Sequence, residues 1–107
     1  MSHVILVGYG MEKEELELKK DFFIERGFKV DIKNGQTETI GNLFDWLIIL
    51  WPFVIDKSTE EQIIRIKHWI WLNKRVCIIC ETKPIGIPSG VEYYPCWNNF
   101  KIRNFIA

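Results

Sequence analysis

The sequence predicts an α/β fold with a mostly parallel sheet of four to five strands and helices on both faces. The clearest observation is the segment 45–52, Asp-Trp-Leu-Ile-Ile-Leu-Trp-Pro, in which an apolar run begins after an acid and stops at a proline. A strand that is apolar at every position is buried on both faces, as in the centre of a parallel sheet. Similar runs occupy 3–7 and 75–80, with helical patterns between them. We expect residues 1–107 to form one domain, because a chain of this length supports one core.

The first strand is expected to lead into a helix. After the strand 3–7 and the segment 8–10, the pattern over 11–26 has one apolar face at helical spacing. Gly27 is typical of a helix C-terminus, because glycine readily adopts the left-handed conformation found there. The apolar face comprises Leu16, Phe22 and Phe23, with Leu18 at its edge.

The next strand has the pattern of a sheet edge. Segment 28–32 alternates apolar and polar residues, which indicates one buried and one solvated face. Segment 36–44 is too short for more than one or two helical turns before the central strand. We therefore expect no full helix between these two strands.

The second half contains a capped helix and a short tail. Ser58 and Glu61 have the spacing of a capping box, which predicts a helix over 58–73 ahead of the strand 75–80. A further strand is expected over 91–94. Segment 97–106 is read as either a short closing helix or an edge strand.

Charge and composition exclude several classes of partner. The 14 basic and 14 acidic residues balance, so neither nucleic acid nor an anionic membrane is expected as a partner. Residues 1–61 carry 7 basic and 12 acidic side chains, a net charge of −5, and residues 62–107 carry 7 and 2, a net charge of +5. Unlike halves are therefore expected to attract, within one molecule or between two.

The chain is expected to be cytoplasmic. No segment approaches the roughly 20 apolar residues that span a bilayer, and the N-terminus lacks the pattern of a signal peptide. Three cysteines, an odd number, fit a reducing compartment. Cys77 and Cys80 lie three apart on a strand, which sends their side chains to opposite faces. His3 and His68 have no second histidine at ligand spacing, so neither a metal nor a cofactor is expected.

A ligand site is expected where the first and central strands end. Ligands of open α/β sheets bind at the carboxyl ends of neighbouring strands. Lys13 occupies the position of the third glycine of a dinucleotide fingerprint, so a tight turn is the alternative reading of 8–10. The candidate residues for a nucleotide-like ligand are Gly8, Tyr9, Gly10, Trp51 and Pro52.

Two carboxylates near this edge are candidates for catalysis. Glu60 and Glu61 begin the helix 58–73, where a positioned carboxylate would stabilise a charged transition state. Capping explains Glu61 without catalysis, and Glu60 is an ordinary first-turn acid.

The helix 58–73 has more apolar surface than one sheet contact needs. One face carries Ile63, Ile66, Trp69 and Ile70, while a second carries Ile64, Trp71 and Leu72, with His68 among them. The second face should meet either the C-terminal tail or another subunit, and a homodimer or protein partner through this helix is therefore expected.

The order of the predicted elements resembles TIR domains and the related nucleoside deoxyribosyltransferases, which have flavodoxin-like folds. In TIR domains an aspartate, an apolar strand and a proline-containing loop precede a helix carrying the glutamate used in NAD cleavage. Segments 45–52 and 75–88 and the helix after Ser58 match that layout. The resemblance implies Glu60 or Glu61 at the position of that glutamate.

Two functions follow from these patterns. The first is a small intracellular binding or protein-interaction module that modulates a partner without catalysis and holds a nucleotide-like ligand. The alternative is an N-glycosidase or deoxyribosyltransferase-type enzyme acting on NAD or nucleosides through Glu60 or Glu61.

Overall fold

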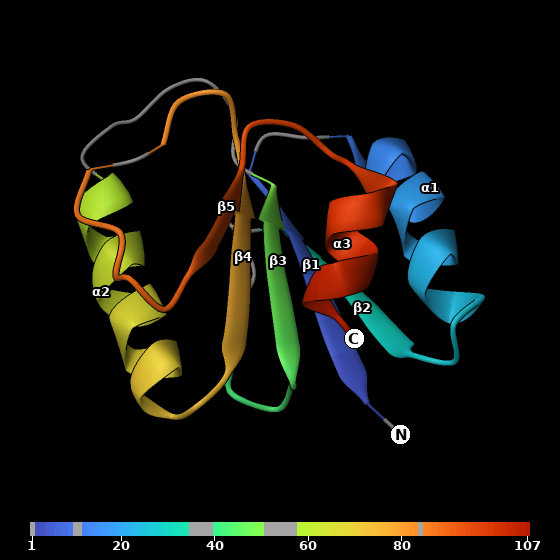
Figure 1. The fold of residues 1–107 in the computed structure, drawn as a ribbon, viewed down its shortest axis with the longest axis horizontal. Coiled ribbons are helices and arrows are strands. Elements are labelled where there is room, and N and C mark those ends of the chain that lie inside the picture. Colours follow the sequence, from blue (N-terminus) through green and yellow to red (C-terminus); the bar gives the residue numbers. More distant parts are fainter. Residues whose placement is uncertain (1, 10–11, 35–39, 51–57, 84) are drawn as a thin grey trace.

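The computed structural model describes residues 2–9, 12–34, 40–50, 58–83 and 85–107, and these form a five-stranded parallel sheet with three helices (Figure 1). The strands are β1 (His3–Gly8), β2 (Lys29–Asn34), β3 (Trp46–Leu50), β4 (Arg75–Ile79) and β5 (Glu92–Tyr94). The helices are α1 (Lys13–Ile24), α2 (Ser58–Trp71) and α3 (Asn99–Phe105). The strand order β2-β1-β3-β4-β5 is the flavodoxin-like order, and the predicted fold class is confirmed.

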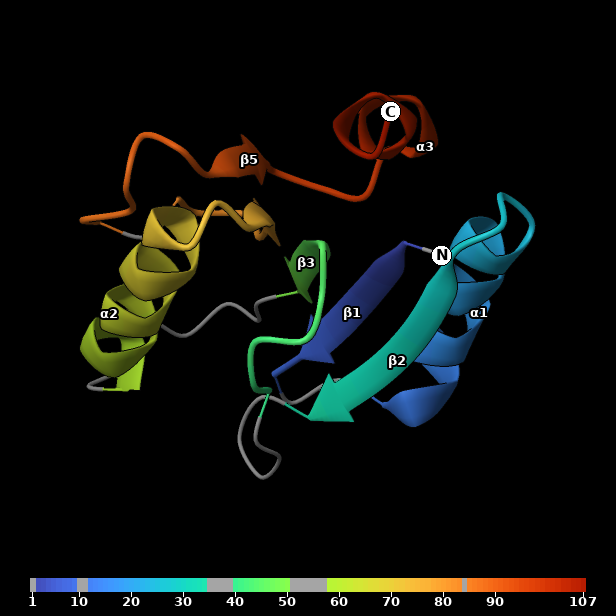
Figure 2. The same cartoon turned by 90° about the horizontal axis from the view of Figure 1, so that it is seen from below.

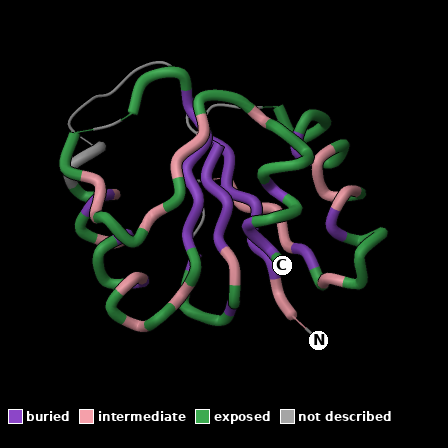
Figure 3. Tube along the Cα trace, viewed as in Figure 1, coloured by how far each residue is buried: buried purple, intermediate pink, exposed green. Residues whose placement is uncertain are grey.

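The central strand β3 is buried on both faces, as its continuous apolar run predicts. Leu47 and Ile49 join one buried cluster, whereas Ile48 and Leu50 join the other. Figure 3 shows that burial is concentrated in the inner strands. The alternation of side chains along β3 therefore supplies the centres of both clusters.

The two faces of the sheet are covered by different elements. Figure 2 shows α1 and α3 on one side of the sheet and α2 on the other. We call the first side the α1/α3 face, where Leu16, Phe23 and Ile102 are buried, and the second the α2 face, where Ile66 and Trp69 are buried. In the described part of the chain, α2 is the one helix on its face, because the segment 40–45 before β3 is not helical.

Two helices end in the same hydrogen-bonded motif. Gly27, with φ of 84°, donates its N–H to Ile24, and Phe28 donates to Phe23 at the end of α1. Asn73, with φ of 62°, takes the corresponding position after α2. The positive φ explains the choice of glycine and asparagine, the residues that tolerate this conformation best.

Some details differ from the sequence-based expectations. Leu18, expected at the edge of the buried face of α1, is 76% exposed, because α1 uses a narrower stripe centred on Leu16 and Phe23. Within segment 97–106, Asn99–Phe105 form the helix α3, and the side chain of Asn98 before it accepts a hydrogen bond from the Lys101 N–H at 3.1 Å. This N-cap decides between the two readings of the tail.

Both edges of the sheet are accounted for. β2 pairs only with β1 and is the edge strand that its alternation predicts. On its polar side, Asp31 contacts the His3 ring, with 2.5 Å between Oδ2 and Nε2. β5, at the opposite edge, has three residues.

Of the helices that the structure describes, none has both the length and the apolar character to cross a bilayer.

Candidate functional site

The carboxyl ends of β1 and β3 lie side by side, as the sequence predicts. The Tyr9 N–H donates to the Leu50 carbonyl at 3.2 Å. Packing explains the glycine at position 8, since a Cβ there would lie 2.9 Å from Leu16 Cδ1. Glycine thus allows α1 to pack closely on β1. The other three candidate ligand residues, Gly10, Trp51 and Pro52, lie outside the described residues.

The Tyr9 side chain packs into the cluster of the α2 face. It is 6% exposed, and burial raises the pKa of the phenol to about 12, while the nearby positive charge of Arg65 lowers it in part. Tyr9 is therefore neutral at physiological pH.

The other chemistry-bearing side chains are distributed over the molecule. Glu61 is exposed near the start of α2, and the side chain of Glu60 lies outside the described part. Cys77 belongs to the cluster of the α1/α3 face and Cys80 to that of the α2 face, which confirms that they point to opposite faces. Within the described ranges, no three His, Cys, Asp or Glu side chains are grouped to hold a metal ion.

The outward side of α2 is apolar and exposed. Ile64 and Trp71 are 66% and 77% exposed, and the His68 ring stacks on Trp71 with 6.1 Å between ring centroids. These three residues, which we call the outer stripe of α2, recur at helical spacing. Leu72 is half-buried. The tail does not cover the stripe, because α3 packs on the opposite face of the sheet.

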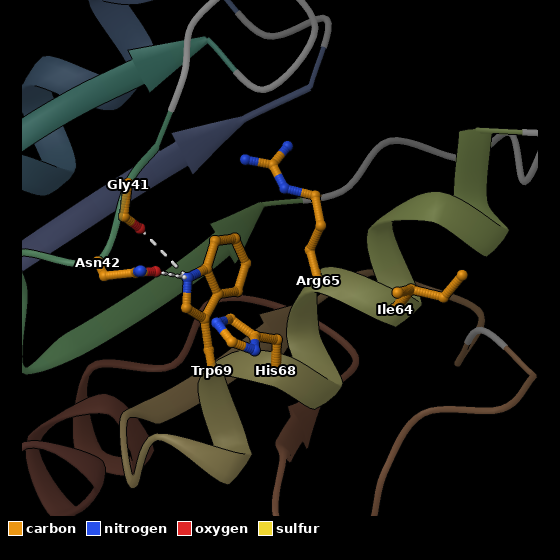
Figure 4. Close-up of a pocket in the computed structure, with 6 residues that line it drawn as sticks. All are labelled: Gly41, Asn42, Ile64, Arg65, His68 and Trp69. Atoms are coloured by element: carbon orange, nitrogen blue, oxygen red, sulfur yellow. Dashed lines mark hydrogen bonds between the residues drawn. The ribbon is translucent and has the colours of Figure 1, made fainter.

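A groove of about 440 Å³ runs beside the outer stripe, between α2 and the segment before β3. Figure 4 shows the Trp69 indole pointing from α2 toward that segment, with the Arg65 side chain rising beside it. The described lining residues are Gly41, Asn42, Ile64, Arg65, His68 and Trp69.

Hydrogen bonds fix the inner wall of this groove. Trp69 Nε1 donates to the Gly41 carbonyl at 3.2 Å and to Asn42 Oδ1 at 3.0 Å. The Trp69 ring also packs edge-on against Phe44, with 5.7 Å between centroids. The Arg65 guanidinium lies over the same indole, 5.4 Å from its centroid. The two hydrogen bonds of Trp69 thus join α2 to a segment that lies 27 to 28 residues earlier in the sequence.

The sequence pattern did not reveal this groove. Trp69 was placed correctly on the buried face of the helix, but its hydrogen-bond partners come from a segment without periodic structure. A usable signal was the indole N–H itself, because a buried tryptophan normally finds an acceptor.

Comparison with known proteins gives no indication of a function. No protein-family model, curated protein or solved structure matches this chain. Function must therefore be inferred from the chain's own residues.

Proposed function

We propose that this chain is a protein-interaction module without catalysis of its own, and that it pairs with a second copy through the outer stripe of α2. The observation that carries the proposal is the exposure of Ile64 and Trp71 on one side of a helix whose other side is buried. Large apolar side chains gathered on a surface are typical of protein contacts.

The spacing along α2 suits a two-fold arrangement. In an antiparallel pair of helices, Ile64 of each copy faces Trp71 of the other, because the two residues lie seven apart on one stripe. The stacked His68 ring then lies near the symmetry axis. Such an interface uses the same patch twice and closes as a dimer.

Charge supports the antiparallel direction. Glu61 lies three residues before Ile64, and Lys74 lies three residues after Trp71. Antiparallel pairing with Ile64 opposite Trp71 therefore places Glu61 of each copy opposite Lys74 of the other. The net charges of −5 before residue 62 and +5 after it favour the same contact of unlike halves, an attraction that salt weakens.

The energetics predict a weak dimer. Burying two Ile64 and two Trp71 side chains contributes on the order of 10 kcal/mol. The loss of translational and rotational freedom offsets at least about 4 kcal/mol of this, which leaves about 6 kcal/mol, or tens of micromolar. We therefore expect association in the micromolar range rather than an obligate dimer.

The layout shared with TIR domains is part of this proposal. Asp45 precedes the buried strand β3, and α2 and β4 follow in the order of that family. A cytoplasmic location is likewise proposed, on the cysteine content.

Sedimentation over a series of concentrations tests the pairing. We expect the wild type to pass from monomer to dimer, and Trp71→Lys to remain monomeric because it places a charge in the apolar contact. The matched control is Leu18→Lys on α1, since Leu18 and Trp71 are 76% and 77% exposed. This variant should dimerise like the wild type.

Two outcomes would contradict the proposal. A wild type that stays monomeric up to millimolar concentration has no functional self-contact. Equal loss of association in Leu18→Lys and Trp71→Lys would show that added charge, not the outer stripe, controls it.

A further inference from the structure

Beyond self-association, we propose that the groove between α2 and segment 40–44 binds a small anion, a phosphate or carboxylate, attached to a flat apolar ring. The groove has the volume of a ligand pocket, about 440 Å³ in a range of roughly 300–1,000 Å³. It shares Ile64 and His68 with the outer stripe, whereas Gly41, Asn42, Arg65 and Trp69 belong to the groove alone.

The groove is rich in hydrogen-bond donors. Arg65 supplies a guanidinium with a planar set of N–H groups suited to phosphate or carboxylate. The Asn42 oxygen already accepts the Trp69 indole hydrogen, which directs the amide Nδ2 of Asn42 elsewhere as a donor. None of the six described lining residues carries a carboxylate. This donor set selects a ligand with negative charge.

The charge of Arg65 is available to such a ligand. Among the described residues, no carboxylate oxygen lies within ion-pair distance of the Arg65 guanidinium. Tyr9, whose phenol is near Arg65, is neutral at physiological pH because burial raises its pKa to about 12. Glu61 lies one helical turn away and does not line the groove.

The apolar part of the ligand has a wall to pack against. The Trp69 ring is 3% exposed and forms the base of the groove beneath the Arg65 guanidinium, where two hydrogen bonds and Phe44 fix its orientation. The exposed surfaces beside it are the Ile64 side chain and the His68 imidazole. An apolar side chain and an aromatic ring beside a cation suit a planar ring with an attached anion better than a free inorganic ion.

Four probes separate the parts of this ligand in NMR titrations that follow the Trp69 indole N–H and the amides of Gly41 and Asn42. Adenosine monophosphate offers ring and phosphate, and indole carboxylate offers ring and carboxylate. Adenosine and inorganic phosphate each offer one part. We expect one or both of the first two probes to bind at these resonances, and the last two to bind at least tenfold more weakly. The comparison of the first two distinguishes phosphate from carboxylate.

Arg65→Gln and Lys67→Gln form a matched pair, because each removes one positive charge from α2 and Lys67 does not line the groove. Arg65→Gln should weaken binding about tenfold, whereas Lys67→Gln should change it less than about twofold. Asn42→Asp is the second variant. Its carboxylate still accepts the indole hydrogen bond, but it brings negative charge into the groove and should abolish binding.

Trp71→Lys separates this inference from the proposed pairing, because it should leave probe binding intact while preventing association. Equal weakening by Arg65→Gln and Lys67→Gln would indicate nonspecific attraction and overturn the inference. So would the absence of shifts at Trp69, Gly41 and Asn42 with all four probes.

Discussion

The α1/α3 face of the sheet is closed by two helices and a set of aromatic rings, whereas the α2 face is closed by one helix and by loop segments. On the first face, Phe23 is fully buried and makes edge-to-face contacts with Phe22, Phe28 and Trp97, with centroid distances of 5.3, 6.4 and 6.0 Å. The ring quadrupole favours this edge-to-face geometry, and of these four rings only Trp97 carries a polar group, the Nε1 that donates to Asn99 Oδ1 at 2.6 Å.

On the second face, loops complete the packing and polar bonds hold the loops. Trp69 Nε1 binds Gly41 and Asn42, and the Tyr93 hydroxyl donates to the Cys80 carbonyl at 2.8 Å. Loop backbone needs such partners, because it lacks the internal hydrogen bonds of a helix. The difference shows how one sheet can use a helix-covered face for stability and a loop-closed face for a groove.

The largest effect should come from the helix-covered face. Phe23→Ala removes a ring that packs against three others, and we expect the free energy of unfolding to fall by about 3–5 kcal/mol. Urea denaturation followed by circular dichroism measures it. Leu18→Ala on the same helix is the control and should stay within about 0.5 kcal/mol, because Leu18 is exposed.

Trp71→Ala extends this test to the other face. It should leave the unfolding free energy of the monomer nearly unchanged, since the side chain is 77% exposed. A loss similar to that of Phe23→Ala would mean that the outer stripe is part of the core, and the contrast between the faces would be lost.

Alkaline pH should weaken both faces in sequence. Burial, with a smaller contribution from Glu92, raises the pKa of the Cys77 thiol above its ordinary 9.0 on the α1/α3 face. On the α2 face, burial raises the pKa of Tyr9 from 10.0 to about 12. The folded state thus holds both protons more tightly than the unfolded state, so stability is constant at lower pH and falls as the pH rises above 9.

The loss of stability that is due to Tyr9 is expected between pH 10 and 12 and amounts to roughly 2 kcal/mol. Denaturant titrations at a series of pH values measure it. Cys77→Ala should flatten the decline from pH 9 upward, whereas Tyr9→Phe should flatten only the part above pH 10. A decline that neither variant alters would assign the effect to other groups.

The smallest effect concerns Glu61 at the start of α2. Glu61→Gln should change the unfolding free energy by less than about 1 kcal/mol, because glutamine also serves at this position of the capping box that the sequence predicts. Incubation of the wild type with NAD and a panel of nucleosides should release no base. Release by the wild type that disappears in Glu61→Gln would favour the glycosidase alternative instead.

The sequence was sufficient for the elements whose patterns are local. The unbroken apolar run of β3 predicted burial on both faces, and the alternation in β2 predicted an edge, because side-chain direction follows directly from strand geometry. Gly27 marked the end of α1 for a similar reason. The prediction that Leu18 lies at the edge of the buried face of α1 was wrong. Helical spacing gives the direction of a side chain around the helix axis, but it does not give the width of the stripe that packs on the sheet.

The groove could not be predicted in the same way. It depends on Gly41 and Asn42 meeting Trp69, a contact set by the path of a segment with no periodic pattern. The carboxyl-edge site was predicted from fold position, and three of its five residues lie outside the described part. The periodicity of a sequence predicts which face of a helix or strand is buried, whereas loop contacts determine where a groove remains on one face of the sheet.

The sheet edges bear on how this chain avoids aggregation. An unpaired strand edge can add strands from other molecules, and cationic side chains or a short strand prevent that growth. Lys29 and Lys33 lie on β2, and β5 ends after three residues, so both edges are poor templates for a further strand. Strand addition is thereby disfavoured, and the pairing that we propose uses a helix surface, where the number of joined molecules stops at two.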